Sequence, residues 1–265
     1  GLNVAMGYRS MYENTTGASN VALGHSALLN NTTASNNTAV GYTAGYSNTT
    51  GAQNTFIGRQ ASYRNTTGLY NSSFGNDALY YNTTGGYNTA LGAAALNNNT
   101  TASGNTAVGY VSLTSNTTGT NNVALGSNSL QPNTTGSQNT ALGKGASASN
   151  STGSNNTSVG FEALVSNTTA SNNTAVGYQA GYSHTTNGFL TAIGYKAGYT
   201  GNTDNAFVGY EAGYNSTGGS NTAMGSYRAL YSNTSGSSNT AIGREALQAN
   251  TTASNNTAVG YQAGY

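Results

Sequence analysis

Apolar residues recur along the chain in one fixed place, immediately before a glycine. The residue before this glycine is always Val, Leu, Ile, Met or Phe, the next one back is nearly always Ala, and the third is mostly Thr or Val. A short β-branched segment of this kind predicts one strand in each repeat. The glycine returns at a constant interval from Gly7 and Gly24 up to Gly194, and only its last steps, after Gly194, differ slightly in length. Because the spacing is so regular, we interpret the chain as about sixteen copies of one unit.

The position before each glycine stays apolar while its shape changes, which is typical of a core position. We therefore assign a structural core to seven of these residues: Val40, Ile57, Val108, Val176, Ile193, Ile242 and Val259. Both faces of the short strand are rather apolar, as in strands that are buried on both sides. The glycines themselves mark a corner where a side chain would clash or forbid the necessary φ angle. The corner glycines in question are Gly41, Gly58, Gly109, Gly177, Gly194 and Gly260.

The rest of each unit completes one turn of the chain. After two variable positions, Ala or Ser is followed by Leu or Gly, as at Ala27 and Ala44, which predicts a second short strand that packs inward. The following Asn-Thr-Thr-Gly or Asn-Thr-Thr-Ala predicts a turn. Two strands and two corners in each repeat form one coil, in which stacked Asn side chains can hydrogen-bond to one another. The predicted fold is an all-β, parallel β-solenoid (β-roll) of about sixteen 17-residue coils.

The repeats occupy the whole sequence, so residues 1–265 are expected to form a single repeat domain. Neither end carries a polar capping repeat, and a solenoid normally has one, so we expect this domain to be a fragment of a longer fibre. Irregular coils are expected near residues 195–230. There the glycine spacing changes and the loop from Thr200 to Asp204 is shorter than the others.

Composition and charge remove several classes of function. Charged residues make up 5% of the chain, the net charge is +1 and cysteine is absent. These values argue against a nucleic-acid partner, a polybasic membrane anchor and disulfide bonds, and no apolar run is long enough to span a membrane. The two histidines, His25 and His184, lie about nine coils apart, so no metal cluster or catalytic triad is expected. We therefore expect neither an enzyme nor a cofactor.

Tyrosine is the main hint of a binding surface. Two columns are predicted on neighbouring coils, Tyr178, Tyr195 and Tyr210 after the corner glycine, and Tyr182, Tyr199 and Tyr214 at a later position of the same coils. Exposed tyrosines of this kind could stack on sugar rings or on another surface, or they could simply cover the space that Gly leaves in place of Leu.

The Asn-Thr-Thr loops also offer rows of Asn-x-Thr sequences, the acceptor sites of N-linked glycans. The alternative is that these residues were selected for the hydrogen bonds of the turn. The candidate acceptors are Asn14, Asn48, Asn65, Asn116 and Asn167.

The strand motif resembles that of a known family. Thr38-Ala39-Val40-Gly41-Tyr42-Thr43-Ala44 and Val123-Ala124-Leu125-Gly126-Ser127-Asn128-Ser129 are similar to the Ser-Val-Ala-Ile-Gly-x-x-Ala/Ser repeats in the heads of trimeric autotransporter adhesins, which are YadA-like repeats, and to repeats of phage-type tail-fibre proteins. The resemblance implies left-handed β-rolls, three chains wound around one axis, with one apolar strand face inside each roll and the other against its partners. The repeat of that family is shorter, and here an Asn-Thr-Thr-Gly loop is added.

Three functions are compatible with this sequence. The first is an extracellular or cell-surface fibre shaft of an adhesin or tail-fibre-like protein, a homotrimer that projects a binding tip toward a cell-surface or glycan ligand. The second is a self-assembling extracellular filament or sheath, in which solenoid ends stack through unpaired strand edges. The third is an ice-binding solenoid, which would need regular Thr rows on a flat β-face.

Overall fold

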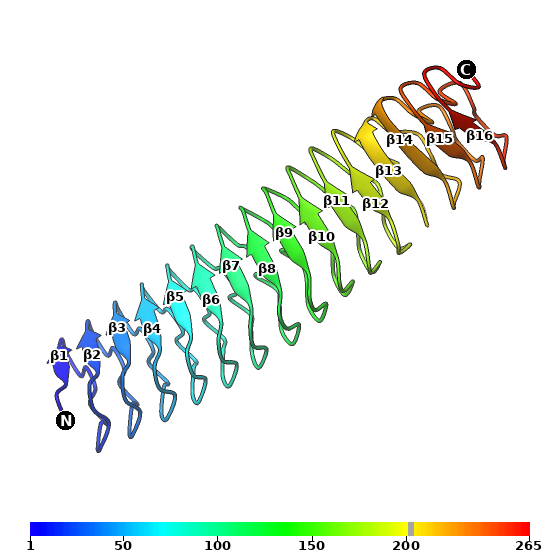
Figure 1. Cartoon of the computed structure of the whole chain (residues 1–265). Helices are drawn as coiled ribbons and strands as arrows, with labels where there is room; N and C mark the ends of the chain where they lie inside the picture. Colours follow the sequence, from blue (N-terminus) through cyan, green and yellow to red (C-terminus); the bar gives the residue numbers. More distant parts are fainter. Residues whose placement is uncertain (201–203) are drawn as a thin grey trace. The chain divides into compact units, whose positions relative to one another are not determined.

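One strand per repeat organises the structure, as the glycine spacing predicts. The computed structural model describes residues 1–200 and 204–265, and its contacts divide the chain into two compact units, Gly1–Gln138 and Asn139–Tyr265. We refer to them as the N-terminal and C-terminal units. In both units the chain is a parallel β-solenoid without helices among the described residues, which confirms the predicted fold class (Figure 1).

The N-terminal unit contains eight three-residue strands that pair in chain order. Each strand residue pairs with its equivalent in the next coil, as Thr38 does with Thr55 and Ala39 with Phe56, so every coil repeats the same register. The strands are β1 Val4–Met6, β2 Val21–Leu23, β3 Thr38–Val40, β4 Thr55–Ile57, β5 Ser72–Phe74, β6 Thr89–Leu91, β7 Thr106–Val108 and β8 Val123–Leu125.

The C-terminal unit also holds eight parallel strands in chain order, with less regular lengths. Two of them are longer than the rest, and the register between them shifts after Val208. This irregularity falls within the segment 195–230, whereas residues 201–203 of the expected short loop lie outside the described residues. The strands are β9 Thr140–Leu142, β10 Thr157–Val159, β11 Thr174–Val176, β12 Thr191–Ile193, β13 Ala206–Tyr210, β14 Thr222–Tyr227, β15 Thr240–Ile242 and β16 Thr257–Val259.

The core of each coil is small and partly polar. The middle residue of the strand points inward and is fully buried, as Ala39 and Phe56 are. Opposite it, the residues three and four positions after the corner glycine are buried as well, for example Ala27 and Leu28. A coil that buries so little apolar surface depends on its neighbours for stability, as expected for a solenoid.

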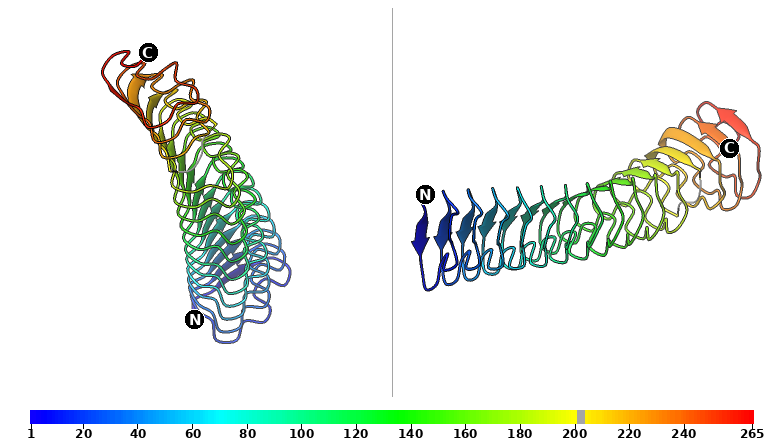
Figure 2. Two further views of the ribbon diagram at one scale, coloured as in Figure 1. Left: turned by 90° about the vertical axis from the view of Figure 1, so that its right-hand side faces the viewer. Right: turned by 90° about the horizontal axis from the view of Figure 1, so that it is seen from below.

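The wall opposite the strands is not a second strand, so that prediction was wrong. The segment after the corner forms consecutive turns in every coil, and Figure 2 shows these turns along the side of the N-terminal unit that faces away from its strands. Left-handed residues alternate with right-handed ones there, as at Ser26 (φ 54°) and Leu28 (φ 49°). Each such L-residue costs about 1–2 kcal/mol. Hydrogen bonds between coils, such as Leu28 N–H to the Ala44 carbonyl at 3.0 Å, offset this cost.

The corner requires glycine for two reasons. Gly41 has φ 139°, and a Cβ atom there would lie 2.3 Å from the carbonyl oxygen of Gly58 in the next coil. Gly177 repeats both features with φ 137° and a contact of 2.3 Å to the Gly194 carbonyl oxygen. The predicted corner role is confirmed, and the same positive φ recurs at the other glycines assigned to it: Gly58, Gly109, Gly194 and Gly260.

Two columns of buried asparagines run through each unit beside the apolar core. We call the first the loop Asn ladder. Its member Asn48 donates from Nδ2 to the Oδ1 of Asn31 in the preceding coil, 3.0 Å away, and to the carbonyl of its own loop, 2.8 Å away. The second, which we call the strand Asn ladder, precedes each strand, and its member Asn37 accepts at Oδ1 a bond from the Asn54 backbone N–H at 2.9 Å. Hydrogen bonding of Asn along the stack, as predicted, is confirmed, and it satisfies polar groups that burial would otherwise penalise.

Candidate interaction surfaces

The outer face of the sheet is an uncharged surface that runs along each unit. We define the outer strand face as the first and third residues of every strand, because alternate residues of a strand point to the same side. The third residue is always apolar and the first is mostly Thr or Val, and no strand among the described residues contains a charged residue. The third residues in the N-terminal unit are Met6, Leu23, Val40, Ile57, Phe74, Leu91, Val108 and Leu125.

This arrangement corrects the core assignment made from the sequence. The assigned residues lie on the outer strand face, where Val40, Ile57, Val108 and Val176 are half-buried and Ile193, Ile242 and Val259 are exposed. The residue that points into the interior is the second one of each strand, which is Ala in most coils and Phe at Phe56 and Phe207. Variation in shape among Val, Leu, Ile, Met and Phe therefore marked a surface column rather than the interior of one chain.

The predicted tyrosine columns of the C-terminal unit are present, and each contains one tyrosine more than predicted. Tyr178, Tyr195 and Tyr210 stack with centroid distances of 5.3 and 5.0 Å, and Phe161 and Tyr227 extend this column. Tyr182, Tyr199 and Tyr214 stack at 4.9 Å, and Tyr231 continues them. All these rings are within 20° of parallel to their neighbours.

The stacking favours a packing role for these columns. A neighbouring ring about 5 Å away covers part of each face, so a sugar ring has no room between them. Between the two columns, Arg228 bonds Glu211 at 2.7 Å and lies over the rings of Tyr227 and Tyr231. Burial raises the pKa of Tyr199, and the adjacent phenols of Tyr214 and Tyr182 raise it further.

The candidate glycan acceptors belong to the loop Asn ladder. Asn48, Asn65, Asn116 and Asn167 are fully buried, and Asn14 is half-buried. Their amide nitrogens already donate to the carbonyls of their own loops, as Asn65 Nδ2 does to Gly68 at 3.1 Å. A glycan on Nδ2 would displace these bonds and does not fit the folded coil. The structure therefore contradicts the acceptor interpretation at the four buried positions and supports the turn interpretation.

Candidate metal ligands and histidines are scattered in the described part of the chain. No group of three or more potential metal ligands among His, Cys, Asp and Glu occurs among residues 1–200 and 204–265. His25 lies between the rings of Tyr8 and Tyr42, each 5.2 Å away, whereas His184 is buried in the loop Asn ladder. No helix long and apolar enough to cross a membrane occurs in the described part of the chain.

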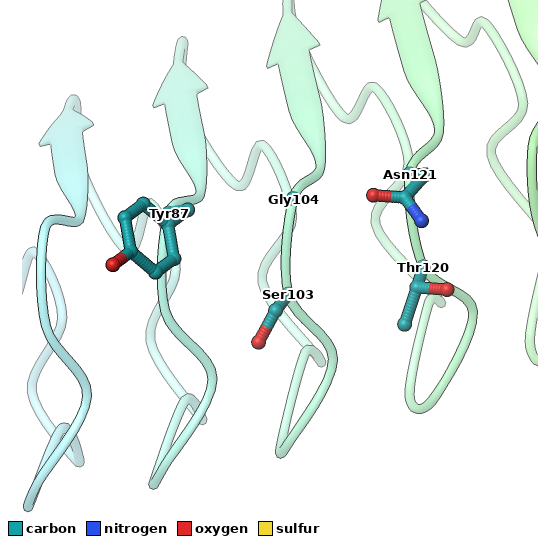
Figure 3. Close-up of a pocket in the computed structure, with 5 residues that line it drawn as sticks. All are labelled: Tyr87, Ser103, Gly104, Thr120 and Asn121. Carbon is teal, nitrogen blue, oxygen red and sulfur yellow. The ribbon is translucent and has the colours of Figure 1, made fainter.

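Sequence reasoning missed one surface feature in the N-terminal unit. A shallow depression of about 370 Å³ is lined by Tyr87, Ser103, Gly104, Thr120 and Asn121, which come from three successive coils (Figure 3). The signal was present in the sequence as a break in a column. The position that holds Tyr70 and Tyr87 in two coils holds glycine in the next one.

The chain matches no protein-family model, no curated protein and no solved structure.

Proposed function

We propose that this chain is the shaft of an extracellular fibre, of the adhesin or tail-fibre type, in which three copies associate through their outer strand faces and project a binding tip. The observation that carries the proposal is the uncharged apolar column on that face. Parallel sheets are normally covered on both sides, and monomeric proteins rarely expose contiguous apolar surface of this extent. In the N-terminal unit Leu91 is 47% exposed and Leu125 is 44% exposed. Neither lies in the first coils, so the exposure is not caused by the beginning of the chain.

A second copy of this chain suits the column better than an unrelated partner. Its own outer strand face has the same coil-to-coil spacing, so equivalent side chains can interdigitate along the whole length of contact. No charge has to be desolvated, because the described strands contain none. The choice of three copies comes from the resemblance of the Thr-Ala-Val-Gly motif to trimeric adhesin repeats.

The test is the solution mass of paired variants. Replacing Val40 and Ile57 by Asp places two charges on the outer strand face, where association would bury them. The matched control replaces Asn36 and Gln53 by Asp in the same two coils, on exposed residues whose left-handed φ angles of 63° and 59° Asp tolerates.

Light scattering distinguishes the outcomes. The wild-type chain and the control are expected at three times 26.7 kDa, and the variant with Asp at 40 and 57 at 26.7 kDa. A folded wild-type monomer would overturn the trimeric shaft. A mass that keeps rising with concentration in both variants would instead support the filament, since ends rather than faces would then associate.

An ice-binding face is the second candidate, and one observation favours it. Strand Thr residues form an outward column in both units, half-buried at positions such as Thr38, Thr55 and Thr106. Against it, the neighbouring column mixes Val with Leu, Met and Phe, which makes the face uneven. Thermal hysteresis in a monomeric wild-type chain would favour ice binding over the shaft.

A further inference from the structure

Rings in a tyrosine column are covered by their neighbours, and a column that stops leaves one ring uncovered. In the N-terminal unit, the position two residues before each strand forms such a column. Tyr70 and Tyr87 occupy it in successive coils and stack at 4.9 Å with an interplanar angle of 12°. The next coil has Gly104 at this position, and Asn121 follows.

Gly104 ends the stack and leaves the adjacent side of the Tyr87 ring open. The exposed fraction is 66% for Tyr87 and 43% for Tyr70. Gly104 has φ 73°, and the same left-handed conformation occurs at Tyr70 (56°) and Tyr87 (59°), so the backbone of the column continues without interruption. The gap is therefore a missing side chain in a regular column and does not reflect a distorted coil.

The rim of this gap is polar and neutral. A Cβ atom at Gly104 would lie 2.5 Å from Asn121 Oδ1, so the Asn121 carbonyl oxygen lies over the glycine, and Figure 3 shows it on that side. Ser103 Oγ accepts a bond from the Gly86 backbone N–H at 3.0 Å, which leaves its own hydroxyl hydrogen to donate. The depression thus presents one aromatic face beside hydroxyl and amide groups that can donate and accept, and none of its lining residues is charged.

A pyranose sugar has the complementary chemistry. One face of such a ring carries C–H groups that pack on an aromatic face, while its edge carries hydroxyls that both donate and accept. The depression, at about 370 Å³, is within the range of about 300–1,000 Å³ that is usual for small-molecule sites. Because a charged ligand would find no counter-charge here, a neutral sugar fits better than an anionic one.

We propose that Tyr87, with the gap over Gly104 and the polar groups of Ser103 and Asn121, forms a binding subsite for one neutral hexopyranose unit. The lining residues of this subsite precede strands β6, β7 and β8 in the chain, and none of them belongs to the outer strand face as defined above. It is open and shallow, so a single sugar is expected to bind with a Kd of about 1 mM, the weak end of specific binding.

Saturation-transfer NMR on the whole chain tests the subsite. The probes are methyl β-D-galactopyranoside, methyl α-D-mannopyranoside and N-acetylglucosamine, with glycerol as a hydroxyl-rich probe that lacks a ring face. Transfer to the C–H protons of at least one pyranoside, and not to glycerol, is expected for the wild type. No transfer to any of the pyranosides would overturn the proposal.

Three variants locate the binding. Tyr87→Ala removes the ring, and Gly104→Tyr covers it with a third stacked ring in a conformation that the column already holds. Each is expected to weaken binding at least about tenfold, as when an aromatic anchor is lost. Tyr110→Ala removes a tyrosine of similar exposure, 63%, from another column and is expected to bind normally.

The Gly104 variant is the sharper of these tests because it adds an aromatic ring and still removes the free face. The exposed Asn121 side chain must shift to admit it, and Gly104→Asn serves as a second variant, since Asn already adopts this conformation at Asn36 and Asn121. With circular dichroism unchanged, full binding by both Gly104 variants would refute the subsite.

Discussion

The loop Asn ladder is unbroken in the N-terminal unit and interrupted in the C-terminal unit. From Asn31 to Asn133, each member in the first unit donates to the Asn one coil earlier, at distances between 2.6 and 3.1 Å. In the second unit, His184 and Ser216 take the places of two asparagines. Each Asn uses both halves of its amide, so one replacement affects the bonds of two coils.

His184 reproduces only part of the Asn pattern. Its Nε2 bonds the carbonyl of Asn187 in its own loop, as a ladder Asn would. Among the described residues its Nδ1 finds no partner, and neither does Asn167 Oδ1 in the preceding coil, although both atoms are buried. The strand Asn ladder is interrupted in the same coil, where Leu190 stands in place of Asn. Strands β11 and β12, which this coil joins, still pair in the common register, so the register there does not depend on these ladder bonds.

The largest expected effect comes from the corner glycines, which both units share. Gly41→Ala meets the Gly58 carbonyl and an unfavourable φ, and we expect it to lower the free energy of unfolding by about 3–5 kcal/mol. Gly260→Ala has the same φ problem, but its nearest atom is 3.9 Å away, so the loss should be about 1–3 kcal/mol. Guanidinium unfolding followed by circular dichroism measures both, and equal losses would show that the contact between coils is not the cause.

Next in size is the removal of a ladder amide from each unit. Asn65→Ala breaks bonds to Asn48 Oδ1, to Gly68 O and from Asn82 Nδ2, and should cost about 2–4 kcal/mol. Asn167→Ala breaks bonds to Asn150 and Ala170 and also removes an oxygen that had no partner among the described residues.

The expected cost at Asn167 is accordingly smaller, about 1–2 kcal/mol. Native-state hydrogen exchange can assign each loss to its own unit. A greater loss for Asn167→Ala than for Asn65→Ala would contradict the view that the ladder is weaker in the C-terminal unit.

The contrast also shows what the sequence alone could and could not predict. The regular glycine period located the strands and corners, because a position that tolerates no side chain is glycine in every coil. Apolarity alone could not predict whether Val40 points inward or outward, since both faces of the strand lack charged residues. The burial of Asn48 was missed because Asn-Thr-Thr is equally suited to an exposed turn. Tyr87 gained its free face from an absent side chain one coil away, and the sequence showed this only as a break in the column of Tyr70 and Tyr87.

Restoring the ladder should stabilise the C-terminal unit. His184→Asn would let Nδ2 donate to both Asn167 Oδ1 and the Asn187 carbonyl, the pair of bonds that other members make, and we expect a gain of about 1–2 kcal/mol. His25→Asn is the control with the opposite sign, because it removes a ring stacked between Tyr8 and Tyr42 and should destabilise slightly. A loss of stability for His184→Asn would mean that the imidazole packs better than the amide it replaced.

The smallest expected effect is a pH dependence confined to the interrupted coil. Burial lowers the pKa of His184 below its usual 6.5, and the hydrogen bond to Asn187 offsets this only in part. The unfolded chain therefore binds a proton at this residue more readily than the folded chain does. The contribution of neutral His184 is fully present above pH 6.5 and is lost as the pH falls below 6.5 toward the lower folded pKa. Amide exchange around residues 184–190 should accelerate over that range, beyond the intrinsic pH effect, and coils near Asn65 should not change. Persistence of this acceleration in His184→Asn would assign it to another group.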